Sequence, residues 1–195
     1  MRSQRQLSVS IPIPPNLPPE VVITALQTFK PIIMHLGSFQ RFEILPTKAE
    51  STADDPFFRP GCEDLYSYQI YELLTLAPGI SKEVTYQCHF QPIHGGSRCR
   101  AEGNAGIRGW VEFSVRPKRE PSSPDGSIST PSTDLDEWEL CEVVVVEGNS
   151  LLMPFIATTV YVSHKGLCNK ILDEVMQNYF KGYDYSAETH PPTTA

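Results

Sequence analysis

The most constraining feature of the sequence is a long helical periodicity near its C-terminal end, at residues 157–180. Apolar side chains recur there every three or four positions, as at Leu167, Ile171 and Val175, while charged and amide side chains occupy the other positions. This spacing is typical of an amphipathic helix that buries one broad face. Gly182 follows it, as glycine often does just after the last turn of a helix.

Most of the chain before this helix alternates apolar and polar side chains, which is typical of half-buried β-strands. The predicted strands are residues 7–13, 38–45, 65–76, 83–91, 97–102, 107–116 and 137–147. A split helix is predicted after the first strand, at residues 20–29 and 32–36, because Pro31 interrupts the pattern. A single amphipathic helix after a run of strands must bury its face on a sheet, so the sequence predicts an α+β fold.

Length and composition indicate one domain. A chain of 195 residues, 40% of them hydrophobic, is long enough to bury a full core. Residues 117–136 are rich in Pro and Ser and are too polar to offset the entropy of ordering, so we expect a disordered insertion between two paired strands. The predicted organisation is one domain over residues 1–185 that contains this insertion, followed by a flexible tail at residues 186–195.

One loop of the predicted domain carries two adjacent phenylalanines. Phe57 and Phe58 lie in residues 46–62, a stretch with several Pro and Asp residues and no periodicity. Because two exposed phenylalanines would be costly, we expect this loop to fold back over an apolar surface.

Charge and hydrophobicity narrow the possible partners. The formal net charge of −7 argues against a nucleic-acid partner, because phosphate binding needs clustered Lys and Arg. No apolar run approaches the roughly 20 residues that span a bilayer, so no stable membrane insertion is expected. The basic first residues lead into a segment broken by prolines, whereas a signal peptide would be continuously apolar, so we predict a cytoplasmic protein. The oligomeric state is left open.

Cysteine and histidine spacing favours neither a disulfide framework nor a metal site. The five cysteines are odd in number and widely scattered, so buried free thiols are expected at Cys62, Cys88, Cys99, Cys141 and Cys168. The histidines are also widely spaced and have no carboxylate at metal-ligand spacing. Neither a dinucleotide-binding glycine motif nor a nucleophile elbow is present. We therefore expect no metal and no cofactor.

Two glutamates stand on otherwise apolar strand faces. Glu72 shares a face with Tyr66 and Tyr68, and Glu142 shares one with Leu140. A carboxyl group that points into an apolar interior would be desolvated, which makes Glu72 and Glu142 candidate catalytic acids or bases. The alternative is that each glutamate lies near a strand end or on the solvated face of the sheet.

Aromatic side chains and one histidine complete the candidate site. Tyr86 is a third candidate catalytic residue, because an inward phenol could polarise a carbonyl group. The candidate ligand-binding residues are Tyr66, Tyr68, Trp110, Phe113 and His164. For the tyrosines the alternative is ordinary core packing with the hydroxyl group at the rim, and for the histidine it is a solvated position on the long helix.

The order of elements, together with several segments, resembles a known superfamily. The segments are residues 11–20, which are rich in proline, the Tyr-Glu-Leu strand at 71–73, the turn at 78–86 and the stretch that leads into the last helix. The order of elements resembles the helix-grip superfamily of START domains, plant allergens and polyketide cyclases. The segments resemble, more narrowly, an uncharacterised fungal family of that fold. The resemblance covers about residues 7–180.

This resemblance implies a curved antiparallel sheet that wraps around the C-terminal helix, with an apolar small molecule in the gap between them. Members of such fungal families often lie among genes for specialised (secondary) metabolites. The fold order, the inward aromatic side chains and the lack of a redox, nucleotide or metal motif favour a cofactor-independent cyclase or pericyclase of that kind of biosynthesis. The protein would hold a flexible substrate in a reactive conformer and polarise a carbonyl group through Tyr or Glu. This hypothesis requires a cavity of about 300 Å³ or more between the sheet and the long helix.

Two other functions are compatible with the sequence. A non-catalytic carrier of lipids or metabolites would have the same cavity without a working acid or base. A protein-interaction module would instead use the Pro/Ser-rich loop, and deletion of residues 121–132 would test it.

Overall fold

The computed structural model describes residues 1–46, 55–59, 64–103, 106–118, 137–151 and 153–188. Within these ranges the strands are β1 (Arg2–Pro12), β2 (Phe39–Leu45), β3 (Tyr66–Ala77), β4 (Ile80–Ile93), β5 (Gly96–Glu102), β6 (Arg108–Pro117) and β7 (Trp138–Asn149). The helices are α1 (Pro19–Gln27), α2 (Lys30–Met34), α4 (Met153–Phe180) and the 3-10 helix η2 (Tyr185–Ala187). The predicted α+β fold, with a split N-terminal helix and a long C-terminal helix, is confirmed.

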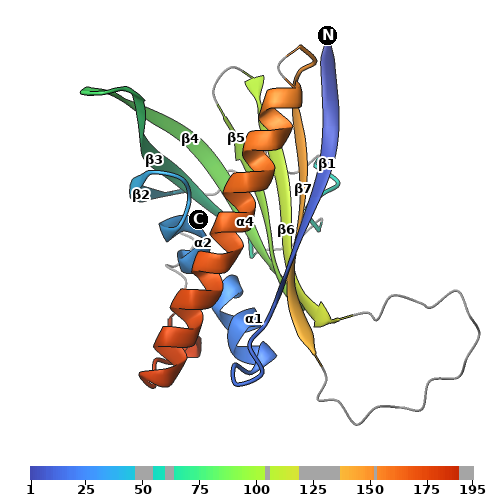
Figure 1. Ribbon diagram of the computed structural model, residues 1–195. Helices are drawn as coiled ribbons and strands as arrows, with labels where there is room; N and C mark the ends of the chain where they lie inside the picture. The colour runs from blue at the N-terminus through green and yellow to red at the C-terminus, as the bar shows by residue number, and fades with distance from the viewer. Residues whose placement is uncertain (47–54, 60–63, 104–105, 119–136, 152, 189–195) are drawn as a thin grey trace, which may run out of the picture.

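The seven strands form one antiparallel sheet in the order β1-β7-β6-β5-β4-β3-β2. Strands β2 to β7 follow one another as a meander, and β1 joins its far edge beside β7, where Leu7 faces Val144. The sheet curves around α4, and α1 and α2 pack beside the C-terminal half of that helix (Figure 1). The concave side of the sheet is therefore covered by helices, which places the core between the two layers.

Helix α4 buries the stripe that its periodicity predicts. Leu167, Ile171 and Val175 are buried against the sheet. The helix begins at Met153, four residues before the predicted start. At its end, Gly182 adopts a left-handed φ of 76°, while the amide of Tyr183 donates to the carbonyl oxygen of Asn178 at 2.9 Å. These features make a Schellman turn, which satisfies carbonyl groups that the last helical turn leaves free.

The break between α1 and α2 lies at Phe29, two residues before the predicted site at Pro31. Phe29 has a φ of 62°, and its fully buried ring stacks on Phe90 with 5.0 Å between the ring centroids. Pro31 is tolerated in the first turn of α2, where its missing N–H would have no helical partner. Packing of Phe29 in the core therefore fixes the position of the break.

Residues 55–59 cross the outer face of the sheet. Asp55 Oδ2 accepts hydrogen bonds from Arg100 at 2.9 Å and from the indole N–H of Trp110 at 3.0 Å. Phe58 is buried and Phe57 is half-buried, in keeping with a loop that folds back over the sheet. The described ranges exclude most of that loop, residues 47–54 and 60–62, together with residues 119–136 of the predicted insertion and residues 189–195 of the predicted tail.

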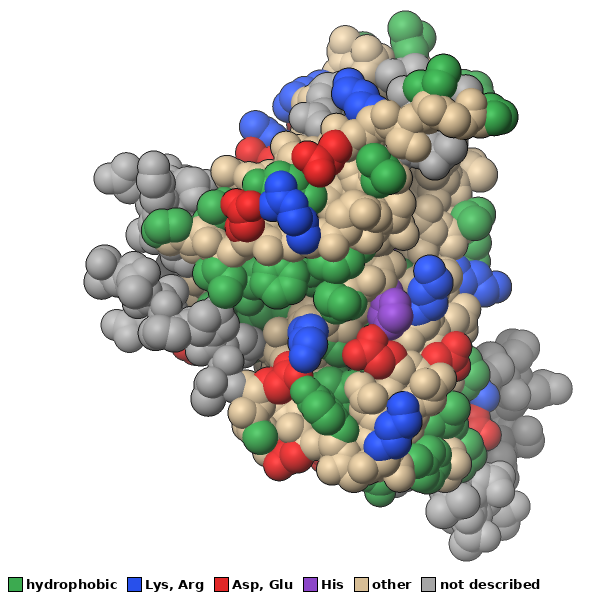
Figure 2. All heavy atoms as spheres, turned by 90° about the vertical axis from the view of Figure 1, so that its left-hand side faces the viewer, with side chains coloured by type: hydrophobic (Ala, Val, Ile, Leu, Met, Phe, Trp, Pro, Cys, Tyr) green, Lys and Arg blue, Asp and Glu red, His purple; other side chains and the backbone are tan. Residues whose placement is uncertain are grey.

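Apolar side chains remain exposed at two places on the surface. Phe42 and Ile44 are exposed on β2, an edge strand, and Phe155 and Val162 are exposed in the first half of α4. The face that lies at the left-hand side of Figure 1 also gathers hydrophobic side chains in a hollow near its middle (Figure 2). Solvent therefore reaches apolar surface from this side of the molecule.

Candidate functional site

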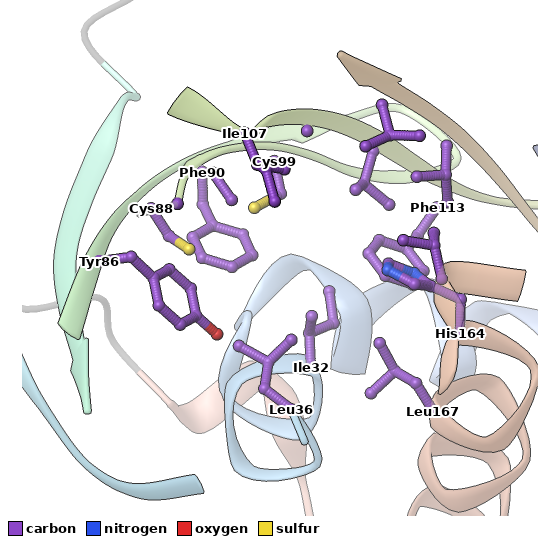
Figure 3. Close-up of a pocket in the computed structure, with 17 residues that line it drawn as sticks. Ile32, Leu36, Tyr86, Cys88, Phe90, Cys99, Ile107, Phe113, His164 and Leu167 are labelled. Atoms are coloured by element: carbon purple, nitrogen blue, oxygen red, sulfur yellow. The ribbon is translucent and has the colours of Figure 1, made fainter. Parts of the chain in front are cut away.

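A cavity of about 240 Å³ lies between the sheet and the helices. Its walls come from strands β4 to β7, from α2 and from α4, and they are mainly apolar (Figure 3). This volume is below the threshold of about 300 Å³ that the sequence-based hypothesis required, because Phe90 and Phe113 from the sheet and Leu36 from the helical side occupy part of the gap.

This volume limits the size of a ligand. An engineered protein cavity of about 150 Å³ holds a benzene molecule, so the larger cavity found here has room for a compact compound of about two fused rings. Gly109 on β6 lines the cavity, and a Cβ atom placed on it would meet no other atom within 4 Å. The space in front of Gly109 is therefore open.

Tyr86 brings the first polar group to the cavity, from strand β4. Its hydroxyl group donates to Glu72 Oε1 at 2.6 Å, and Glu72 lies on the neighbouring strand β3. Burial, followed by the nearby Cys88 and Glu72, raises the pKa of Tyr86 well above its usual value. The phenol therefore keeps its proton and directs it to Glu72.

His164 brings the second polar group, from helix α4. Its Nδ1 atom is hydrogen-bonded to Oε1 of Glu142, a fully buried carboxyl group on β7. Cys168 lies one helical turn further on and donates its thiol proton to Glu142 Oε2 at 3.2 Å. Burial, followed by Glu142, raises the pKa of the Cys168 thiol, which suits it to this donor role.

The two polar groups enter the cavity from different walls. Figure 3 shows Tyr86 on the sheet and His164 on the helix, with apolar side chains between them. Cys88 and Cys99 lie on adjacent strands and also line the cavity. Burial, followed by a hydrogen bond with Cys88, raises the pKa of Cys99, so its thiol stays protonated. The cavity is thus an apolar chamber with a tyrosine and a histidine as its main polar groups.

The structure brings five of the predicted site residues to this chamber. Tyr86, Phe113 and His164 line the cavity, and the two glutamates are bonded to lining side chains, Glu72 to the tyrosine and Glu142 to the histidine. Neither glutamate lies free in the cavity, so each is placed to act through its partner.

Three predicted ligand-binding residues lie elsewhere among the described residues. Tyr66 packs on Phe29, with ring centroids 5.5 Å apart, and Tyr68 is buried in the core. Trp110 lies on the outer face of the sheet, where it donates to Asp55, because strand alternation places it opposite the inward residues of β6. These three assignments to the cavity are not supported by the geometry.

Sequence reasoning missed the thiols beside the site. Cys88 and Cys99 were expected only to be buried, and Cys168 was not connected with Glu142. All three, and Cys141, are free and buried, whereas Cys62 lies outside the described residues. One signal was present in the sequence, because residues 164 and 168 are one helical turn apart and so share a face of the long helix.

Two further kinds of site are absent from the part of the chain that the structure describes. Within the described ranges, no group of three or more His, Cys, Asp or Glu residues is arranged to hold a metal ion. None of the helices in those ranges combines the length and the hydrophobicity needed to cross a membrane.

Comparison with known proteins gives a family and a fold. The model of a family described as a domain of unknown function (DUF7053) matches residues 2–177. No curated protein matches the sequence.

Three solved structures resemble the chain over almost its whole length. The Zhui aromatase/cyclase from Streptomyces sp. R1128 has a TM-score of 0.56 at 9% identity, over 91% of this chain and 96% of its own. TTHA0849 from Thermus thermophilus has a TM-score of 0.52 at 12% identity, over 89% of this chain and 98% of its own. Ara h 8.0201 has a TM-score of 0.52 at 10% identity, over 90% of this chain and 100% of its own. At these identities the likeness shows the fold alone, the helix-grip fold.

Proposed function

The chain belongs to the DUF7053 family of domains of unknown function, and we propose that it binds a compact apolar small molecule between its sheet and α4. The observation that carries the proposal is the apolar cavity of about 240 Å³ with a hydrogen-bonded, half-buried polar pair at each of two walls. Ligand sites are commonly apolar chambers with a few convergent polar groups. Because the formal net charge is −7, the proposal does not include a nucleic-acid ligand.

We extend this proposal to a cofactor-independent enzyme of the cyclase or isomerase class, in fungal specialised metabolism. The similarity in fold to an aromatase/cyclase supports the extension, as do the residues at the cavity. His164 is the group that would exchange a proton with the substrate, and Glu142 would orient it. Tyr86, held by Glu72, would position the substrate from the other wall. The apolar walls would keep a flexible substrate folded in one conformer.

A carrier without catalysis is the second candidate. The observation in its favour is the apolar character of the lining, since apolar walls alone are enough to hold a lipid or metabolite. The two functions differ in what leaves the protein: an enzyme releases an altered molecule, whereas a carrier releases the same molecule. The interaction role proposed for the Pro/Ser-rich loop concerns residues that lie mostly outside the described ranges.

Filling the cavity tests the proposed binding. Gly109→Leu places a side chain in the open space before Gly109, so the affinity for naphthalene should fall by about tenfold or more. Naphthalene fluorescence, titrated with protein, measures this affinity. Gly166→Leu on α4 is the matched control, because a Cβ atom there also meets nothing within 4 Å and Gly166 is not part of the lining.

Two results would overturn the proposal. One is a wild-type protein that shows no saturable binding of naphthalene or of its hydroxyl and keto derivatives. The other is equal affinity in Gly109→Leu and in the wild-type protein, which would place the bound probe outside the cavity.

A further inference from the structure

The polar groups of the cavity differ in whether they can give or accept a hydrogen bond. Tyr86 has a single hydroxyl proton, and it donates that proton to Glu72 at 2.6 Å. A phenol oxygen still carries lone pairs when its proton is engaged. Toward a ligand in the cavity, Tyr86 therefore acts as an acceptor.

His164 can also act as a hydrogen-bond acceptor toward a ligand, because of its contact with Glu142. Both carboxyl oxygens of Glu142 have a partner: Cys168 donates a thiol proton to Oε2, and Nδ1 of His164 meets Oε1. When Glu142 is ionised and accepts a hydrogen bond on each oxygen, the proton of the imidazole lies on Nδ1. In the neutral ring the other nitrogen, Nε2, is then left with a lone pair, so His164 in this form also acts as an acceptor in the cavity.

The remaining polar side chains of the lining are thiols. Cys88 and Cys99 interact with each other across adjacent strands, and a thiol is only a weak donor. Among the described residues that line the cavity, the tyrosine and the histidine are strong side-chain acceptors, and no side chain is a strong donor. A ligand that carries only acceptors would leave the lone pairs of the tyrosine and the histidine without a partner.

We propose that the ligand is a compact apolar ring compound with a hydroxyl group, which it donates to Nε2 of His164. The proposal rests on the proposed function, since it concerns the same cavity, and it adds the chemical class of the ligand. It also corrects one sequence-based expectation: a carbonyl group polarised by Tyr or Glu does not fit a site whose tyrosine and histidine both accept.

Matched probes of two fused rings test the class of ligand. Naphthol carries a hydroxyl donor, tetralone has a carbonyl acceptor in its place, and naphthalene has neither. Because naphthol alone can donate a hydrogen bond to the acceptors of the cavity, the wild-type protein should bind naphthol about tenfold more tightly than tetralone. Competition against naphthalene fluorescence measures both affinities. Equal affinity for naphthol and naphthalene would contradict the inference and leave apolar binding intact, whereas no binding of any probe would overturn both proposals.

Glu142→Gln tests the role of the histidine directly. The amide oxygen of the new side chain can accept the Cys168 thiol, which turns its NH₂ group toward Nδ1 of His164. Nδ1 must then accept, so the imidazole proton moves to Nε2 and the cavity gains a donor. The preference for naphthol over tetralone should disappear or reverse. The matched control is Glu147→Gln on the same strand, since Glu147 pairs with Arg2 on the outer face and should keep the wild-type preference.

A measurement on the wild-type protein stands beside the variant, in case Glu142→Gln does not fold. The ¹⁵N chemical shifts of the His164 ring report which nitrogen carries the proton. We expect a protonated Nδ1 and a bare Nε2 in the neutral ring. A proton on Nε2 with a bare Nδ1 would overturn the inference.

Discussion

At the residue scale, the burial of Tyr68 makes the stability of the protein depend on pH. Its ring is 4% exposed and meets Phe42 and Phe90 edge-on, with centroids 5.6 Å and 5.7 Å away. Burial, followed by the neighbouring Tyr66, raises the pKa of Tyr68 to about 12. The unfolded chain loses this proton near pH 10, about two units earlier than the folded protein does. A residue assigned to the ligand by its sequence pattern is therefore part of the core that supports the cavity.

Tyr68→Phe tests this coupling. The stability that the protonated phenol contributes is complete below about pH 10 and is lost as the pH rises toward about 12, because the unfolded state ionises first. Over that range the free energy of unfolding of the wild-type protein should fall by about 2–3 kcal/mol more than that of Tyr68→Phe. Urea denaturation at several pH values measures both. Parallel losses in the two proteins would show that Tyr68 does not titrate as described.

At the scale of elements, helix α4 has one glycine within it and another just after its end. The two glycines have opposite effects on the stability of the protein. Gly182 adopts a left-handed φ of 76° in the Schellman turn, whereas Gly166 lies within the helix and has open space around its Cα atom. A left-handed conformation disfavours any residue with a Cβ atom, while glycine within a helix costs conformational entropy.

Replacing each glycine by alanine should therefore shift stability in opposite directions. Gly182→Ala should lower the free energy of unfolding by about 1–2 kcal/mol, and Gly166→Ala should raise it by about 0.5–1 kcal/mol. Denaturant titration of the two variants beside the wild-type protein checks the signs. If Gly182→Ala leaves the free energy of unfolding unchanged or raises it, the end of α4 is not held by the Schellman turn.

The elements that the sequence predicted are those with a local signal. The period of α4 and the alternation of the strands are properties of neighbouring residues, so the α+β fold could be predicted from them. The pairing of β1 with β7 joins residues far apart in the chain and carries no local signal. The split at Phe29 was placed two residues late because tertiary packing of its ring determines the break.

The candidate site was predictable to the extent that it depends on strand faces. Tyr86, Phe113 and Glu142 could be assigned inward positions from alternation alone. Trp110 was assigned to the ligand although alternation places it on the other face, where Asp55 binds its indole. The partner of Glu142 could not be predicted, because the contact with His164 depends on how α4 lies across β7.

At the scale of the whole molecule, the account depends on where an apolar compound binds. The cavity is one candidate, with Val111, Val144 and Leu167 in its walls. The exposed apolar side chains just before α4 and in its first half are a competing surface, since Leu151 is 83% exposed and Val162 is 65% exposed. The two locations carry different methyl groups, so one experiment can distinguish them.

The decisive measurement is a naphthalene titration of the full chain, followed by methyl ¹H–¹³C NMR spectra. We predict saturable shifts of the methyl groups of Val111, Val144 and Leu167, with those of Leu151 and Val162 unchanged. Shifts confined to Leu151 and Val162, or no shifts at all, would contradict a ligand-binding cavity between the sheet and α4.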